Sequence, residues 1–175
     1  MYRMTSFLVK LFALVALWGT LSGHPAFAQG DGGEVERQRQ EFLNRYVRYL
    51  NAEEARKWVA SQGTSVLYLG EREMFPGLGA GLKGKQVKVY ASEGVRAIPW
   101  LDKAGVKYVL FQMPGKVLAD NGVLIAPENY LLGPETDKQG KPTGRFTLVT
   151  YKEAANVIYR TLVVYEAFAK GVIRK

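Results

Sequence analysis

Few side chains in this sequence could act as nucleophiles or general bases. The chain holds one histidine, His24, and no cysteine. Serine–histidine–acid triads, cysteine–histidine pairs and most zinc sites require an imidazole or a thiolate. Whether the protein can use such chemistry therefore depends on whether His24 is kept.

The histidine lies in an amino-terminal segment that has the features of a secretory signal. Arg3 and Lys10 are its charged residues, and the apolar run that follows, residues 11–21, is shorter than the roughly 20 residues of a membrane-spanning helix. The sequence AFA ending at Ala28 fits a small-x-small cleavage site. We expect residues 1–28 to be removed as a signal peptide, which leaves a mature chain without histidine that is periplasmic or secreted.

Composition narrows the class of protein further. The chain has no cysteine for disulfides and no Asn-x-Ser/Thr site, which favours a bacterial periplasm over a eukaryotic secretory route. Loss of the two basic residues of the signal lowers the net charge of +8 by two units. A basic surface favours phosphate-rich or acidic partners, and it serves solubility equally well. No spacing of residues indicates a metal site or a cofactor.

The first part of the mature chain, residues 29–64, is predicted to be a helical extension. Residues 34–50 show helical spacing, with apolar residues on one stripe and arginines mostly off it. Asn51 fits the N-cap of a second, shorter helix that stops before Gly63. Tyr46, Tyr49 and Trp58 lie among these arginines. They fit either base stacking with a nucleic acid or, at helical spacing, burial in the core.

The remainder, residues 65–175, is predicted to be one α/β domain, a mixed sheet with helices on both faces. The turn DNG, residues 120–122, predicts a tight hairpin between runs 116–119 and 123–126, with 129–132 extending the second strand. Residues 133–144 read as a polar loop. The other expected strands are residues 65–69, 86–90, 107–112 and 145–151, and the expected helices are residues 71–83, 95–104 and 152–170, the last ending at Gly171.

A glycine run, residues 79–84 (GAGLKG), matches the pattern G-x-G-x-x-G. A dinucleotide site needs this run between a strand and the helix that follows it. Here a helical segment precedes the run and a strand follows it. Read through Lys85, the run also approaches a phosphate-binding loop, but Gln86 stands where that loop needs a hydroxyl. We expect a loop that ends a helix.

The order of elements from Ser65 onward, together with three short motifs, resembles a single-unit member of the phospholipase D-like superfamily, in its small secreted nuclease branch. Residues 114–116 (PGK) stand where that family has His-x-Lys. After four further residues, Asn121 and Gly122 stand where it has Asp-Gly, and residues 126–129 (APEN) stand where it has Gly-Ser-x-Asn. Residues 83–89 and 102–106 resemble the entries to the family's second and third strands.

The resemblance implies a degenerate, non-catalytic domain. The family's histidine attacks phosphorus, and here Pro114 replaces it, with no ring nitrogen to attack or to carry a proton. Such a pseudoenzyme would still bind a phosphate-bearing ligand, either a nucleic acid or a phospholipid headgroup. The resemblance also implies a homodimer. The candidate ligand-binding residues are Lys116, Asn129, Asn121 and Asp120.

Other interpretations stay open. Lys116 also fits an ordinary solvated lysine, and Asn129 fits a turn former. The chain could instead be an accessory component of an envelope, secretion or transfer assembly, contacting a protein partner or anionic lipid through the arginine-rich helix 34–50. It could also be a carboxylate-based hydrolase of cell-wall glycans. The candidate carboxylates for that reaction are Glu71, Glu73, Asp102, Asp120 and Glu128.

Overall fold

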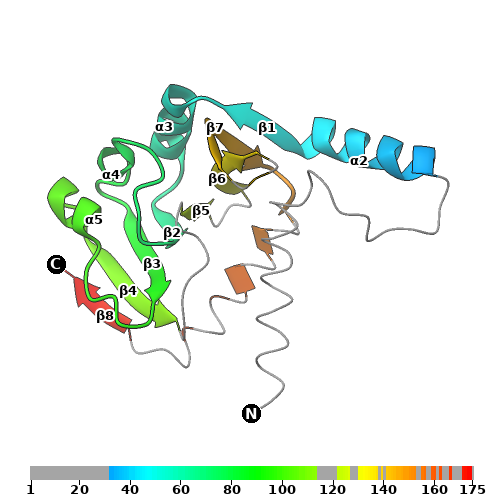
Figure 1. Ribbon diagram of the computed structural model, residues 1–175. Helices are drawn as coiled ribbons and strands as arrows, with labels where there is room; N and C mark the ends of the chain where they lie inside the picture. Colours follow the sequence, from blue (N-terminus) through cyan, green and yellow to red (C-terminus); the bar gives the residue numbers. More distant parts are fainter. Residues whose placement is uncertain are drawn as a thin grey trace, which may run out of the picture.

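The computed structural model describes residues 32–113, 122–126, 130–137, 139, 141–152, 155–156, 159–160, 162, 166 and 171–174. Its centre is one eight-stranded sheet (Figure 1). The strands are β1 (Val47–Leu50), β2 (Ser65–Leu69), β3 (Gln86–Ser92), β4 (Tyr108–Met113), β5 (Val123–Ala126), β6 (Tyr130–Thr136), β7 (Pro142–Val149) and β8 (Gly171–Arg174). The predicted signal peptide, residues 1–28, lies outside the described residues.

The sheet is mixed, as predicted. Its strand order is β1-β7-β6-β5-β2-β3-β4-β8. The adjacent strands β2, β3 and β4 are parallel, and every other neighbouring pair is antiparallel. The parallel strands come from the segment in which apolar runs alternate with helical stretches, because a parallel pair needs a crossover connection between its members.

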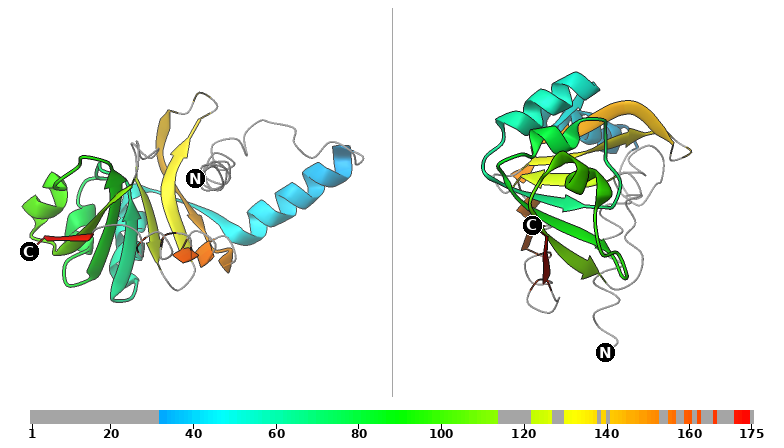
Figure 2. Two further views of the ribbon diagram at one scale, coloured as in Figure 1. Left: turned by 90° about the horizontal axis from the view of Figure 1, so that it is seen from below. Right: turned by 90° about the vertical axis from the view of Figure 1, so that its left-hand side faces the viewer.

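Helices cover both faces of the sheet, which confirms the predicted layering. Strand β2 shows how the two faces arise: Val66 and Tyr68 point to one apolar cluster, and Leu67 points to the other. The first cluster is covered by α3 (Ala52–Ser61), α4 (Leu78–Gly81) and α5 (Pro99–Ala104). On the opposite face, the helical residues Ala155 and Leu162 of the carboxyl-terminal segment pack against the second cluster (Figure 2).

A charged contact ties the carboxyl-terminal helical segment to β3. The ammonium of Lys88 donates to Glu166 at 2.7 Å, and the hydroxyl of Tyr90 donates to the same carboxylate. The Tyr90 ring stacks on Phe111, with ring centroids 5.3 Å apart. Burial, followed by the hydrogen bond to Glu166, raises the pKa of Tyr90 above its ordinary value.

The amino-terminal helix differs from its prediction. Helix α2 (Gly32–Tyr46) ends four residues early, and the predicted helix over residues 34–50 is therefore wrong for 47–50. Those residues form β1, which pairs with β7 at the edge of the sheet. Beyond this junction α2 extends away from the sheet (Figures 1 and 2). Pairing with a strand about 100 residues away, rather than local propensity, decides where this helix ends.

The second predicted helix is confirmed as α3, and it belongs to the main core. Asn51 accepts hydrogen bonds from the backbone N–H groups of Glu53 and Glu54, and the Glu54 carboxylate accepts one from the Asn51 backbone. This reciprocal capping box fixes the start of the helix. Its buried residues Ala55 and Val59 lie in the apolar cluster beneath it. Residues 47–61 thus share one sheet and one core with the elements that follow.

Four further predictions need correction. Helix 71–83 is reduced to α4, because Pro76 and the surrounding glycines disfavour a longer helix. Residues 129–132 do not extend β5, since Tyr130 begins β6, which runs antiparallel to it. The polar loop 133–144 is largely a hairpin of β6 and β7, whose backbone pairing tolerates polar side chains on exposed ribbons. Strand β8 begins at Gly171, where only a helix end was expected.

Candidate functional site

The four candidate ligand-binding residues, Lys116, Asn129, Asn121 and Asp120, lie outside the described residues, as does Pro114. The described residues on either side of the 114–121 segment lie at one edge of the sheet. Ser92 at the end of β3 pairs with Met113 at the end of β4, and Leu69 at the end of β2 pairs with Val123 at the start of β5. Open α/β sheets bind ligands beyond the carboxyl ends of their parallel strands, and this edge is of that kind.

At this edge Gly122 lies in close contact with Tyr68. Gly122 has φ +72°, and a Cβ added there would lie 1.9 Å from the Tyr68 hydroxyl oxygen. The fully buried Tyr68 donates a hydrogen bond of 2.5 Å to the Arg72 carbonyl. Burial raises the pKa of Tyr68 above its ordinary value. The glycine expected in the DNG turn is therefore required by sterics as well as by its backbone angle.

The described candidate carboxylates serve the fold. Glu71 accepts from the backbone N–H of Ser92 at 3.1 Å, at the edge just described. Glu73 accepts from the backbone N–H groups of Gly77 and Gly79 at the start of α4. Asp102 accepts from the Tyr108 hydroxyl at 3.0 Å. Asp120 and Glu128 lie outside the described residues. Each of the three described carboxylates therefore has a hydrogen-bond partner within the fold.

The glycine run 79–84 ends a helix and precedes β3, as predicted. A Cβ on Gly79 would lie 2.6 Å from the Cβ of Ala104, so this glycine lets α4 pack closely on α5. Lys85 does not point to a phosphate site. Its ammonium donates to the carbonyls of Gln62 at 2.5 Å and Gly63 at 3.2 Å, just beyond the last turn of α3. The dinucleotide and phosphate-loop patterns are therefore explained by packing and capping.

An aromatic cluster lies at the junction of α2 and β1, and the sequence indicated only one of its members, Tyr46. Phe42, Tyr46 and Tyr151 form a three-ring cluster with centroids 5.0–5.2 Å apart. The guanidinium of Arg45 lies 5.3 Å from the centroid of the Tyr46 ring. Phe42 keeps 37% of its surface exposed, so the cluster is open to solvent on one side.

A second ring and guanidinium pair lies where β1 pairs with β7, on the side of the sheet that β1 closes. The Arg145 guanidinium on β7 lies 4.9 Å from the centroid of the Tyr49 ring on β1. Tyr49 is 46% exposed, and the Arg145 side chain is 56% exposed. Attraction between a guanidinium and a ring face orients both groups without burying either. We call these six residues the aromatic–arginine surface: Phe42, Arg45, Tyr46, Tyr49, Arg145 and Tyr151.

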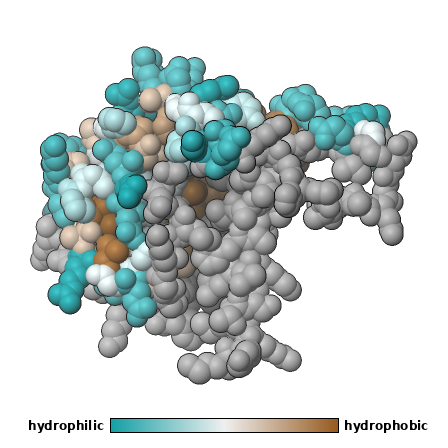
Figure 3. All heavy atoms as spheres, viewed as in Figure 1, coloured by the Kyte–Doolittle hydropathy of each residue, from teal (hydrophilic) through white to brown (hydrophobic). Residues whose placement is uncertain are grey.

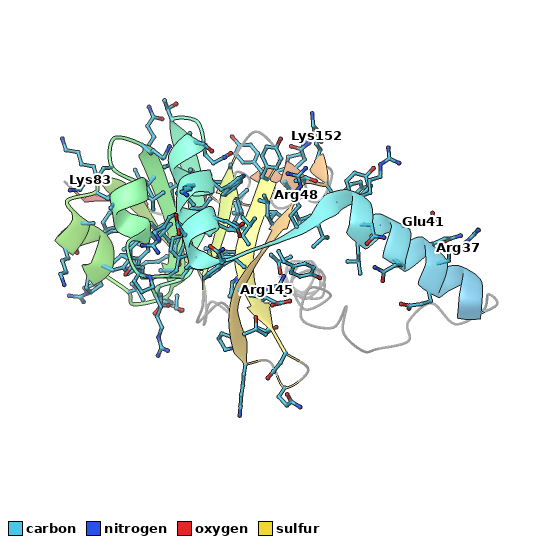
Figure 4. All side chains as sticks on the ribbon, turned by 90° about the horizontal axis from the view of Figure 1, so that it is seen from above. Arg37, Glu41, Arg48, Lys83, Arg145 and Lys152 are labelled. Carbon is cyan, nitrogen blue, oxygen red and sulfur yellow. The ribbon has the colours of Figure 1, made fainter. Side chains whose placement is uncertain are left out.

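Strand alternation places the two ring groups on one face of the sheet. Val47 and Tyr151 pack against the cluster beneath the carboxyl-terminal segment, and Tyr49 follows Val47 by two residues. Leu50 packs on the opposite cluster, so Arg48 belongs to that other face. Figure 4 shows Arg48 on β1 and Arg145 on β7. Arg48 is therefore an exposed arginine of the same strand that lies outside the aromatic–arginine surface.

The core interpretation holds for Trp58 but not for Tyr49. Trp58 is half-buried and packs edge-on against Tyr130, with centroids 6.1 Å apart, as the core interpretation predicted. Tyr49 is exposed, and for this residue the core interpretation is wrong. The sequence alone did not separate the two interpretations for Tyr49, because residues 47–50 fit a helix as well as a strand.

Neither a metal-binding cluster nor a membrane-spanning helix occurs among the described residues. Within these ranges, no three or more histidine, cysteine, aspartate and glutamate residues are grouped so that they could hold a metal ion. None of the described helices has the length and apolar character needed to cross a membrane.

No protein-family model matches the sequence, and no curated protein matches it. Among solved structures the chain is similar to TrmBL2, an archaeal chromatin protein described as showing a novel mode of DNA binding. That match has 9% identity and a TM-score of 0.45, and it covers 80% of this chain and 64% of TrmBL2. The chain is also similar to Nuc, a phospholipase D family member from Salmonella typhimurium. Here identity is 13% and the TM-score 0.44, over 72% of this chain and 97% of Nuc.

Proposed function

We propose that this protein is an exported, non-catalytic α/β domain, resembling a degenerate phospholipase D-like unit, that binds a phosphate-bearing ligand in the cell envelope. One observation carries the proposal: exposed guanidinium groups of Arg45 and Arg145 lie on tyrosine rings at one edge of the sheet. Arginine suits phosphate because its fork of N–H donors matches phosphate oxygens.

The non-catalytic part of the proposal follows from the chemistry of the available side chains. Signal cleavage after Ala28 would remove His24, and Pro114 stands where the family's nucleophile would be. The described carboxylates Glu71, Glu73 and Asp102 accept hydrogen bonds from the protein itself. Carboxylates engaged in this way hold loops and helices in place. This role favours a binding protein over an enzyme that hydrolyses phosphoesters or wall glycans.

A second candidate function, an accessory role in an envelope assembly, is favoured by α2. This helix extends away from the sheet and carries exposed charged residues, among them Arg37 and Glu41 (Figure 4). A projecting helix with charges of both signs suits a protein partner. This function requires α2 but does not require the ring of Tyr49 on β1 or the guanidinium of Arg145 on β7.

The two candidates are separated by measuring direct binding of the purified protein to phosphate-bearing probes. The probes are a fluorescein-labelled oligonucleotide, followed by anisotropy, and phosphatidylglycerol vesicles, followed by sedimentation. We expect at least one probe to bind, with an affinity that falls as salt rises. The double variant Arg45→Ala, Arg145→Ala should weaken that binding, and Lys83→Ala, at the far end of the molecule, should weaken it less (Figure 4).

Two results would contradict the proposed function. Binding of neither probe at low salt would remove the phosphate-bearing ligand and favour the accessory role. Metal-independent turnover of an aryl phosphodiester that is lost in Lys116→Ala would show that the protein is a catalyst.

A further inference from the structure

We infer that the phosphate-bearing ligand is a single-stranded nucleic acid, bound with its bases against the aromatic–arginine surface. This inference rests on the proposed function and narrows it to one ligand class. It is argued from the exposure of the rings, the placement of the guanidinium groups and the charge of α2.

The rings provide two places for unpaired bases. Tyr49 and Phe42 are the large hydrophobic residues that stay exposed among those described, at 46% and 37%. Tyr49 follows Tyr46 by three positions of largely extended chain, a span of about 10 Å. Ring groups spaced along one sheet face suit successive bases of one strand, because every base presents a flat face for stacking.

The guanidinium groups place positive charge beside each ring group. Arg45 accompanies the three-ring cluster and Arg145 accompanies Tyr49. The ion pair of Arg145 with Glu135 is long, at 3.9 Å, and that carboxylate already accepts a hydrogen bond of 2.6 Å from the Thr143 hydroxyl. Arg145 can therefore turn toward a phosphate while its stem stays in place. Alternating rings and charges match the alternating bases and phosphates of a single strand.

The same observations argue against a lipid surface. Helix α2 has three glutamates and three arginines, so it carries no net charge. Helices that bind anionic lipid have a polar face rich in lysine and arginine. The side of α2 seen in Figure 3 is mostly hydrophilic, and Phe42 and Tyr49 alone offer little apolar surface for insertion. A duplex is also disfavoured, because its bases are already stacked on one another.

Anisotropy of a fluorescein-labelled oligodeoxythymidylate, with the purified protein, tests the inference. Base stacking is worth about 1–3 kcal/mol, so Tyr49→Ala should weaken binding by about fivefold or more. Tyr49→Phe keeps the ring and should bind as the native protein does. Arg145→Ala should weaken binding and reduce the salt dependence by about 0.7 in logarithmic slope. Arg48→Ala, on the same strand and the opposite face, is the matched control and should have the smaller effect.

The outcomes distinguish this inference from the proposed function. Stronger binding to the single strand than to a duplex of equal length, with loss in Tyr49→Ala and retention in Tyr49→Phe, supports it. Binding of phosphatidylglycerol vesicles without binding of the oligonucleotide overturns the inference and leaves the proposed function standing. Equal weakening by Arg48→Ala and Arg145→Ala, with no effect of Tyr49→Ala, also overturns it, since general charge attraction would then explain the binding.

Discussion

Replacement of Gly122 by alanine should remove a large part of the protein's stability. In the native structure this glycine has φ +72°, a region in which a Cβ clashes with the backbone. The added Cβ would also lie 1.9 Å from the hydroxyl oxygen and 2.5 Å from the Cζ of Tyr68. Both distances are below any real contact, so the ring or the chain must move.

The cost has two parts. The left-handed backbone conformation costs about 1–2 kcal/mol for alanine. Displacing Tyr68 breaks its hydrogen bond to the Arg72 carbonyl and leaves a buried hydroxyl without a partner, which costs about 1–3 kcal/mol. The ring also packs edge-on against Trp100, with centroids 5.2 Å apart, and moving it disturbs that contact. We expect a total loss of about 2–5 kcal/mol, against a typical stability of about 5–15 kcal/mol.

Gly144→Ala is the matched control. Gly144 has φ +85°, but nothing lies within 4 Å of its added Cβ, so it should lose only the backbone part, about 1–2 kcal/mol. Urea unfolding followed by circular dichroism measures both free energies of unfolding. Equal losses in the two variants would refute the reasoning, because contact with Tyr68 would then contribute nothing.

The remaining predictions concern a helix end and alkaline pH. Lys85→Met should lower the free energy of unfolding by about 1–2 kcal/mol, because the Lys85 ammonium donates hydrogen bonds to carbonyls at the end of α3. Lys83→Met, at an exposed neighbouring lysine, is the control and should change the free energy of unfolding by less than about 0.5 kcal/mol. Burial raises the pKa of Tyr90 and Tyr68 in the folded protein above the value of about 10 for an unfolded chain. The contribution of the two neutral hydroxyls to the free energy of unfolding is therefore complete below pH 10 and is lost as pH rises further. Urea midpoints measured across this range should fall with pH, and the fall should be shallower in Tyr90→Phe; an unchanged slope in that variant would count against the burial argument.

The centre of the fold could be predicted from sequence because its signals are local. Strand β2 has the bounds that its apolar run indicated, since turn-forming residues lie on both sides. Helix α5 ends at Gly105, as predicted, but it begins at Pro99 rather than at residue 95, because proline suits the first helical position and disfavours helix before it. The helical content of the carboxyl-terminal segment also follows from spacing, and its described residues from 152 to 166 are helical.

The edges of the sheet could not be predicted because their partners lie far away in sequence. Val47 and Leu50 fit the apolar stripe of a helix as well as a strand, and only pairing with β7 selects the strand. The polar composition of residues 133–144 indicated a loop, whereas β6 and β7 pair there as a hairpin through backbone hydrogen bonds. Strand β8 pairs with β4, again across a long separation.

The sequence indicated Tyr46 and Tyr49 as candidates for base stacking, but their partners Phe42, Tyr151 and Arg145 were missed for the same reason. Tyr49 and Arg145 are brought together by the register of β1 and β7, with Tyr49 opposite Thr147. The spacing of residues within either strand does not predict that register. The candidate residues suggested by the motif, Lys116, Asn129, Asn121 and Asp120, stay predictions.

The claim that this protein holds a phosphate-bearing strand without cutting it is tested most directly by one assay. The purified protein is incubated with an end-labelled single-stranded oligonucleotide, and both anisotropy and strand length are followed over time. We predict that anisotropy rises at once and that the strand keeps its full length. Progressive shortening by the native protein, absent in Lys116→Ala, would contradict the claim.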